Sequence, residues 1–262
     1  MTPALPRRAR VLGVFPHPDD ETWAAGALLA HCARAGAEVH LVSATRGEAG
    51  TDRSRRAAPG PALGALRSDE LGRAAAALGA RPPRFLDLPD GAVAVTAAAR
   101  DALAALTLAL APDLVVTLGP DGGYGHRDHL ATTALVSAAL TAAGATPRLL
   151  HAVFPRGLFD AVRARLRRSP RGIDLLAPHL DELLGTDAAA VHLSVDARPY
   201  AALKLAALGA HQSQLPGGDP HQFLSPGLIA PLLEREWYTV ASGPALPVGA
   251  TDPFAGLAPH AP

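Results

Sequence analysis

Short apolar runs alternate with longer helical stretches along the first part of the chain. Five apolar, largely β-branched runs have the length of strands: Val11–Phe15, Glu38–Ala44, Arg84–Leu88, Asp113–Leu118 and Leu149–Phe154. The stretches between them have helical character, and most end at or just before a glycine: Glu21–Ala35, Arg67–Leu78, Thr96–Ala111 and Leu130–Ala143. Strands that alternate with helices of about ten residues or more are typical of a parallel sheet. We therefore expect an α/β fold with a doubly wound, mostly parallel sheet and helices on both faces.

The alternation is less regular after residue 154. We expect a helix at Leu158–Arg168, a strand at Val191–Val195 and a helix at Pro199–Gln212. Segments rich in Gly, Pro or Arg predict three irregular regions: a loop at Gly217–Pro226, an exposed loop at Gly47–Gly64 and a poorly packed tail at Ser242–Pro262. No repeat or boundary divides the chain, so we predict a single domain over residues 1–262 with its core at about residues 10–240.

Charge and composition exclude several classes of protein. The 24 Lys and Arg residues balance the 24 Asp and Glu residues, which argues against nucleic-acid or membrane-surface partners. The single cysteine, Cys32, excludes an internal disulfide framework and a multi-cysteine zinc site. Met1–Arg10 is interpreted as a short tail without the apolar core of a signal peptide, and no apolar run reaches the ~20 residues that span a bilayer. We therefore expect a cytoplasmic protein, and leave its oligomeric state open, a homo-oligomer included.

A histidine and three acidic residues follow the first expected strand. They are His17, Asp19, Asp20 and Glu21, directly before an expected helix. Ligands of open parallel sheets bind at the carboxyl ends of the strands, which is where this cluster lies. His17 and Asp20 are candidate metal ligands, which leaves Asp19 and Glu21 for other work. Helix capping would account for one or two of the acids, but not for three of them beside a histidine, because close like charges repel unless a cation offsets them.

A second polar cluster, with His126, Asp128 and His129, follows the fourth expected strand. Together with His17 and Asp20, either histidine would complete a set of two imidazoles and one carboxylate, typical of catalytic zinc with an open position for water. Fe(II) suits the same ligands. Zinc brings the pKa of a bound water to near ~7, a nearby carboxylate such as Asp19 can take the proton, and the second histidine can protonate a leaving group or stabilise an oxyanion. This equipment indicates hydrolysis of an amide or ester.

Six motifs in order resemble the LmbE-like, or PIG-L, zinc deacetylases. They are PHPDDE at Pro16–Glu21, GEAG at Gly47–Gly50, LRSDEL with AAALG within Leu66–Gly79, LDLPDG at Leu86–Gly91, GGYGHRDH at Gly122–His129 and HQSQ at His211–Gln214. The resemblance covers roughly Arg10–Gln214. It implies a Rossmann-like fold, a single LmbE-like domain and removal of the acetyl group from a substrate containing N-acetylglucosamine (GlcNAc).

The resemblance also implies a role for each matching residue. The zinc ligands would be His17, Asp20 and His129, with Asp19 as general base. His126 would be the acid or oxyanion stabiliser, Asp128 would orient His126, and Tyr124 would lie at the site. Arg67 and Asp90 occupy sugar-contacting positions, although Arg67 also fits a surface helix and Asp90 a turn. His211 would either line the pocket or pack on its helix. Arg127 stands where many relatives have proline.

The motifs specify a reaction class but not the substrate's aglycone. GlcNAc-malate, of the bacillithiol type, is the first expectation, with GlcNAc-inositol, of the mycothiol type, nearly equal. Gly47–Gly64 and the region after Pro155 would make that choice. The alternatives are an amidase of thiol conjugates and a non-catalytic, metal-dependent carbohydrate-binding protein. A dinucleotide-binding protein is disfavoured because the first strand runs into FPHPDDE, without the G-x-G-x-x-G turn that approaches a pyrophosphate.

Overall fold

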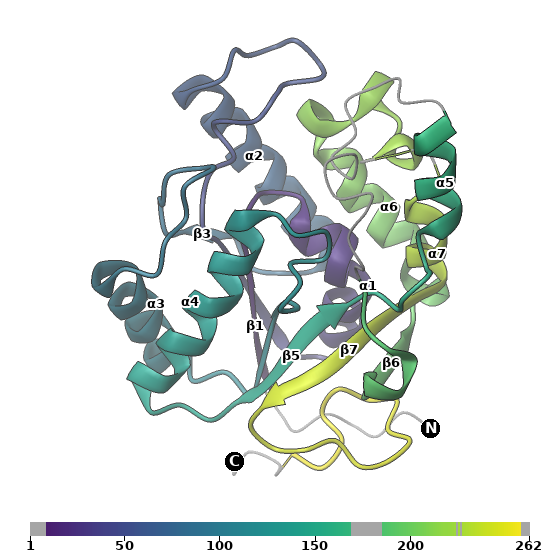
Figure 1. Cartoon of the computed structure of the whole chain (residues 1–262). Helices are drawn as coiled ribbons and strands as arrows, with labels where there is room; N and C mark the ends of the chain where they lie inside the picture. Colours follow the sequence, from purple (N-terminus) through teal and green to yellow (C-terminus); the bar gives the residue numbers. More distant parts are fainter. Residues whose placement is uncertain (1–8, 169–184, 224, 226, 258–262) are drawn as a thin grey trace.

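One seven-stranded sheet organises the computed structural model, which describes residues 9–168, 185–223, 225 and 227–257. The strand order is β3-β2-β1-β4-β5-β7-β6. Figure 1 shows β5 and β7 side by side in this sheet. The strands span β1 (Arg10–Phe15), β2 (Glu38–Ser43), β3 (Arg84–Phe85), β4 (Leu114–Leu118), β5 (Arg148–Val153), β6 (Leu193–Asp196) and β7 (Arg235–Ser242). The first five strands are parallel to one another, and β7 is antiparallel to both β5 and β6. The predicted mostly parallel sheet is confirmed.

The strand order reverses at β1, which positions the site. The chain moves outward from β1 to β2 and β3 on one side, then returns to place β4 and β5 on the other. At this switch point the loops after β1 and β4 diverge and leave a crevice at the carboxyl ends of the strands. The two polar clusters follow these two neighbouring strands.

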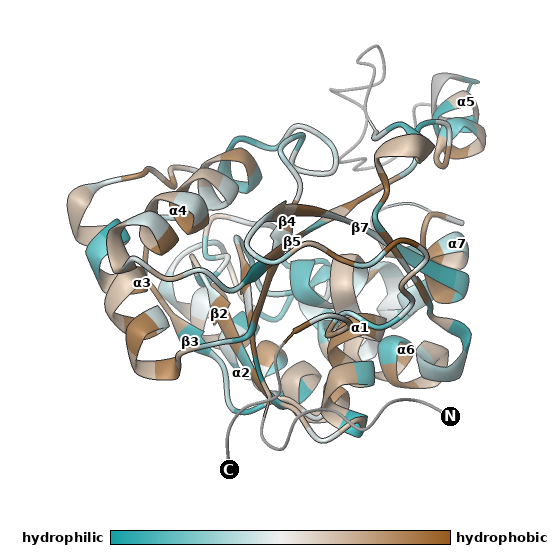
Figure 2. Ribbon diagram, turned by 90° about the horizontal axis from the view of Figure 1, so that it is seen from below, coloured by the Kyte–Doolittle hydropathy of each residue, from teal (hydrophilic) through white to brown (hydrophobic). Residues whose placement is uncertain are grey.

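Helices cover both faces of the sheet (Figure 2), and the central strands β1, β4 and β5 are almost entirely buried. One face carries α1 (Asp20–Arg34), α2 (Pro61–Leu78) and α6 (Ala201–Ala210), and the other carries α3 (Ala97–Leu110) and α4 (Arg127–Ala143). Two shorter helices, α5 (Asp160–Arg168) and α7 (Ile229–Glu234), accompany the later part of the chain. Successive strand residues point to opposite faces, so Val116 belongs to the first core and Val115 to the second. None of these helices has the length and apolarity that a membrane crossing needs.

Several boundaries differ from the sequence-based expectation. α2 begins at Pro61 rather than at Arg67, because proline is favoured in the first helical turn, where its missing N–H costs nothing. β3 pairs with β2 through two residues and ends at Phe85 rather than at Leu88. The helix expected at Pro199–Gln212 is shorter, since 3₁₀ turns flank α6. The 3₁₀ turns are Ala188–Ala190, Arg198–Tyr200, Gln212–Gln214, Pro216–Gly218 and Pro220–Gln222.

The expected poorly packed tail is corrected in part: Arg148 fastens the backbone of residues 244–255, although half of the residues of this segment stay exposed. Arg148, at the start of β5, is fully buried and donates hydrogen bonds to the carbonyls of Pro244, Ala245, Pro253 and Ala255 at 2.6–2.9 Å. Phe254 is also buried. The guanidinium offers five donors in a rigid fork, which lets one side chain fix a segment that has no regular structure. Residues 258–262 of the expected tail and 1–8 of the expected N-terminal tail lie outside the described residues.

Candidate functional site

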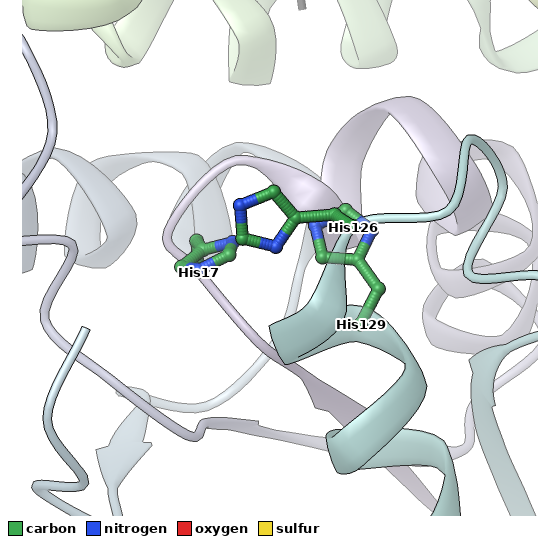
Figure 3. A group of neighbouring side chains, drawn as sticks. All are labelled: His17, His126 and His129. Carbon is green, nitrogen blue, oxygen red and sulfur yellow. The ribbon is translucent and has the colours of Figure 1, made fainter. Parts of the chain in front are cut away.

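Three histidines gather at the carboxyl ends of β1 and β4 (Figure 3). His17 follows β1, His126 is the N-cap of α4 and His129 lies in the first turn of that helix. Their ring centroids lie 5.1 Å apart for His17 and His126, 5.3 Å for His17 and His129, and 4.9 Å for His126 and His129. The structure therefore brings the two sequence clusters together.

A carboxylate oxygen of Asp20 lies between two of these imidazoles. Its Oδ2 is 3.2 Å from Nδ1 of His17 and 3.4 Å from Nε2 of His129. Ligands at about 2.0–2.1 Å from a tetrahedral zinc ion lie about 3.3 Å from one another, so both separations match a pair of zinc ligands. The Asp20 carboxylate is oriented by its other oxygen, which accepts the indole N–H of Trp23 at 2.9 Å.

His129 has the hydrogen-bonding pattern of a metal ligand. Its Nδ1 lies 2.8 Å from the carbonyl oxygen of Gly122, and because a carbonyl only accepts, Nδ1 carries the proton. The lone pair is then on Nε2, which is buried without a hydrogen-bond partner among the described residues. An orphaned buried acceptor is costly, and metal-ligating histidines commonly donate their other N–H to a backbone carbonyl. Among the described residues two groups could hold a metal ion, His17 with His126 and His129, and His17 with Asp90 and Asp128. The two contacts of Asp20 have the spacing of a carboxylate ligand at the same place.

Asp128 holds His17 rather than His126. Its buried carboxylate lies 3.2 Å from Nε2 of His17 and accepts the backbone N–H groups of Gly91 at 2.6 Å and Val93 at 3.2 Å. The expected contact from this carboxylate to His126 is not made. Instead the backbone N–H of Asp128 donates to Nδ1 of His126 at 3.2 Å, because the His126 side chain folds back to cap its own helix.

Because Nδ1 of His126 caps α4, the other ring nitrogen, Nε2, is left to donate a proton into the cleft. Since Nδ1 accepts a hydrogen bond, the proton of the neutral ring is on Nε2. Burial and the neighbouring His17 lower the pKa of His126, which favours the neutral ring. His17 is different: burial lowers its pKa, but the contacts with Asp128, Asp20 and Asp90 raise it well above its ordinary value. Burial also disfavours the charge on Asp20, yet His129 and His17 hold the pKa of this carboxyl well below its ordinary range.

Asp19 is a buried residue that lines the same cleft as His17 and Asp20. Burial raises the pKa of Asp19 to about 7, even though the Arg67 guanidinium acts in the opposite direction. A general base is most effective when its pKa lies near the working pH. Arg67 is itself buried and donates to the Asp19 carboxylate at 3.1 Å and to the carbonyls of Pro18 and Gly47 at 2.8 and 3.0 Å. The reading of Arg67 as a surface arginine is therefore wrong.

The cleft above these groups has a volume of about 270 Å³. The other residues predicted for the site also lie on it. Asp90 Oδ1 is 3.2 Å from Nε2 of His17, and its other oxygen accepts the N–H of Ala49 at 2.8 Å. Tyr124 is buried, and its ring centroid lies 4.9 Å from that of His129. All the residues singled out from the motifs thus border the cleft or stand directly behind it.

Two segments from the regions expected to select the aglycone form one wall of the cleft. Arg53, from the loop after Gly47, and Gln214, from the HQSQ motif, both line it. Glu70 joins the segments: its fully buried carboxylate accepts the N–H and hydroxyl of Ser213 at 2.8 and 2.6 Å and the guanidinium of Arg56 at 2.6 Å. Glu70 lies in LRSDEL and Ser213 in HQSQ, so the motifs marked these positions without indicating the contact.

Comparisons with known proteins identify the family that the sequence resembles. Residues 12–140 match the family model described as PIG-L, GlcNAc-PI de-N-acetylase. Two relatives are named 1D-myo-inositol 2-acetamido-2-deoxy-alpha-D-glucopyranoside deacetylase. The one from Mycolicibacterium gilvum is 36% identical over 90% of this chain and 92% of its own length, and the one from Nakamurella multipartita is 37% identical over 92% of each.

Solved structures share the fold. The N,N'-diacetylchitobiose deacetylase of Pyrococcus horikoshii superimposes with a TM-score of 0.57 at 24% identity, covering 79% of this chain and 71% of that one. GalB, the 4-carboxy-2-hydroxymuconate hydratase of Pseudomonas putida, superimposes with a TM-score of 0.56 at 17% identity, covering 92% and 100%. Since a hydratase shares this fold with a deacetylase, the reaction has to be argued from the residues of the site.

Proposed function

The chain belongs to the family of GlcNAc-PI de-N-acetylases (PIG-L), and we propose that it is a zinc-dependent hydrolase that removes the N-acetyl group from a GlcNAc-containing glycoconjugate. One observation carries the proposal. An Asp20 oxygen lies 3.2 and 3.4 Å from imidazole nitrogens of His17 and His129, and the buried carboxylate of Asp19 stands beside them. We also propose that residues 1–262 form one domain. The sheet supports this, since it contains both β1 and β7.

We propose that His17, Asp20 and His129 hold the ion and that the ion is zinc. Two imidazoles and one carboxylate leave a position open for water or substrate, as in catalytic zinc sites. Fe(II) is the competing ion, because it accepts the same donors. When bound, the metal polarises the amide carbonyl and makes a water molecule more acidic. Two carboxylates, those of Asp128 and Asp90, lie next to Nε2 of His17 and orient its ring.

The remaining groups of the site move the proton and stabilise charge. The Asp19 carboxylate takes a proton as water adds to the carbonyl carbon of the N-acetyl group. The Nε2–H of His126 donates to the oxygen on which negative charge develops, with Tyr124 alongside. When the C–N bond breaks, acetate leaves and the proton passes to the sugar amine, which keeps the reaction balanced. Arg67 keeps the Asp19 carboxylate directed into the cleft by its hydrogen bond.

We propose inositol as the aglycone, ahead of malate. The sequence alone placed GlcNAc-malate first by a small margin. The relatives named as deacetylases of the inositol glycoside align over about nine-tenths of this chain, including the loop and the HQSQ segment that form the cleft wall. Arg53 and Gln214 on that wall are the groups placed to contact the aglycone.

The test is detection of free amine released from GlcNAc-inositol, GlcNAc-malate and diacetylchitobiose. We expect amine release from GlcNAc-inositol, with the highest kcat/KM of the three substrates, and loss of that release in Asp19→Asn. Release from GlcNAc-malate alone would transfer the aglycone assignment to malate. No release from any substrate by a metal-loaded chain would contradict the deacetylase. It would favour an amidase of thiol conjugates or a carbohydrate-binding protein instead.

A further inference from the structure

The backbone of the proposed general base is strained. Asp19 has φ 124° and ψ −29°, a region that residues with a side chain rarely adopt. Such a conformation costs of order 1–3 kcal/mol and persists where surrounding contacts enforce it. The side chain of Asp19 makes no capping hydrogen bond to its helix. The strain thus presents the carboxylate to the cleft, and other residues must maintain it.

Glu21 holds the peptide N–H of Asp19. Its Oε2 accepts that N–H at 2.9 Å, and its Oε1 accepts the hydroxyl of Thr22. The Glu21 side chain is buried, so its charge needs compensation that water cannot supply. A glutamate that only complemented the helix dipole would be expected to remain exposed.

His211 supplies the compensation from the other end of the chain. Its Nε2 lies 3.0 Å from Oε1 of Glu21, across a sequence separation of 190 residues. The ring is fully buried, and its Nδ1 has no hydrogen-bond partner among the described residues, so the bond to Glu21 orients it. The next turn is fastened by Glu70 through Ser213. The imidazole is therefore fixed to the body of the protein rather than free to follow Glu21.

We propose that Glu21 and His211 are positioning residues for Asp19. His211 holds the Glu21 carboxylate, Glu21 holds the Asp19 N–H, and the two contacts keep the strained turn in the conformation that aims the base at the substrate. This inference rests on the proposed deacetylase function. It gives a role to Glu21, the third acid of PHPDDE, and to His211, the histidine of HQSQ, neither of which is among the proposed metal ligands.

The test compares His211→Leu with His211→Gln. Leucine fills the space without a donor, whereas the glutamine amide keeps an N–H within reach of Glu21. We expect His211→Leu to lower kcat by about 10–100-fold, the scale of a displaced catalytic group, with KM changed less than about threefold and the bound metal unchanged. His211→Gln should recover most of kcat. His151→Leu is the matched control, since His151 is a buried histidine of β5 away from the cleft, and its kcat should equal that of the wild type.

Crystal structures of the variants give a readout independent of activity. In His211→Leu, and in Glu21→Leu as a second variant if His211→Leu does not fold, we expect φ of Asp19 to return to a negative value. Wild-type kcat in His211→Leu, or an unchanged Asp19 backbone in the variant that folds, would overturn the inference. So would equal loss of metal and activity in both His211 variants. A wild-type chain that releases no amine would instead overturn the proposed function, and the crystal structures would still decide the positioning role.

Discussion

Replacing Asp19 by asparagine is expected to have opposite effects on catalysis and on stability. The Asp19 pKa is raised from 3.8 to about 7, first by burial, against the opposing effect of Arg67. The folded state then binds the Asp19 proton about a thousandfold more tightly than the unfolded state does. Each factor of ten in that affinity is worth about 1.4 kcal/mol. In the metal-free protein above pH 7, the ionised carboxylate therefore costs about 4 kcal/mol of folding free energy. Asparagine, which resembles the protonated acid, removes that cost and the base together.

The sign of the pH dependence follows from the same linkage. Between about pH 4 and pH 7 the folded metal-free protein holds more protons than the unfolded chain, so this group makes stability fall as the pH rises. Asp19→Asn should lack that slope, unfold at higher denaturant concentration at pH 8 and lose about 10²–10⁴-fold in kcat when loaded with metal. Asp101→Asn, at an exposed acid of α3, is the control for both assays. Near-wild-type kcat would refute the role as base, and a less stable metal-free variant would refute the electrostatic argument.

Four further single substitutions test other parts of the structure. Arg148→Met removes the hydrogen bonds that fix residues 244–255. A hydrogen bond to a charged group contributes about 1.5–3 kcal/mol, and water replaces part of these bonds in the variant. Arg148→Met should therefore lower Tm by roughly 5–15 °C in differential scanning fluorimetry. Lys204→Met leaves the carboxylate of Glu236 buried without its counter-ion. Denaturant titration should show a loss of about 3–5 kcal/mol, part of which Glu236→Gln in the same chain recovers. His129→Ala should lose the metal by elemental analysis, whereas His126→Ala should keep it and turn over ~100-fold more slowly.

The order of strands and helices was predictable where local signals were strong. The first five strands are short apolar runs between helices that close at glycines such as Gly79 and Gly144. β7 was missed because it follows α7 without a turn residue, at Glu234 and Arg235. Its place between β5 and β6 depends on pairing with strands distant in the sequence, which no local pattern encodes. The ordered segment after β7 has the same cause, since the side chain that holds it lies about a hundred residues away.

The site was predictable as far as the motifs reach. The rule for parallel sheets predicted that the PHPDDE and GGYGHRDH clusters would meet, and the three histidine rings do lie together. The choice of His129 over His126 as a metal ligand came from the family resemblance and stays a prediction. The partner of the Asp128 carboxylate was not predictable from the sequence. Asp128 is two residues from His126, yet the helix start turns its carboxylate toward His17. The link between Glu21 and His211 was also invisible, because it joins the first and last motifs across the body of the molecule.

The most direct test of the account measures deacetylation of GlcNAc-inositol as zinc is returned to the chelated protein. Amine release should be abolished by the chelator and should rise in proportion to bound zinc until each chain holds one ion. His129→Ala, treated identically, should remain inactive and unloaded. Full amine release by the chelated, metal-free chain would contradict the central claim, as would a fully loaded chain that binds the glycoside and releases no amine.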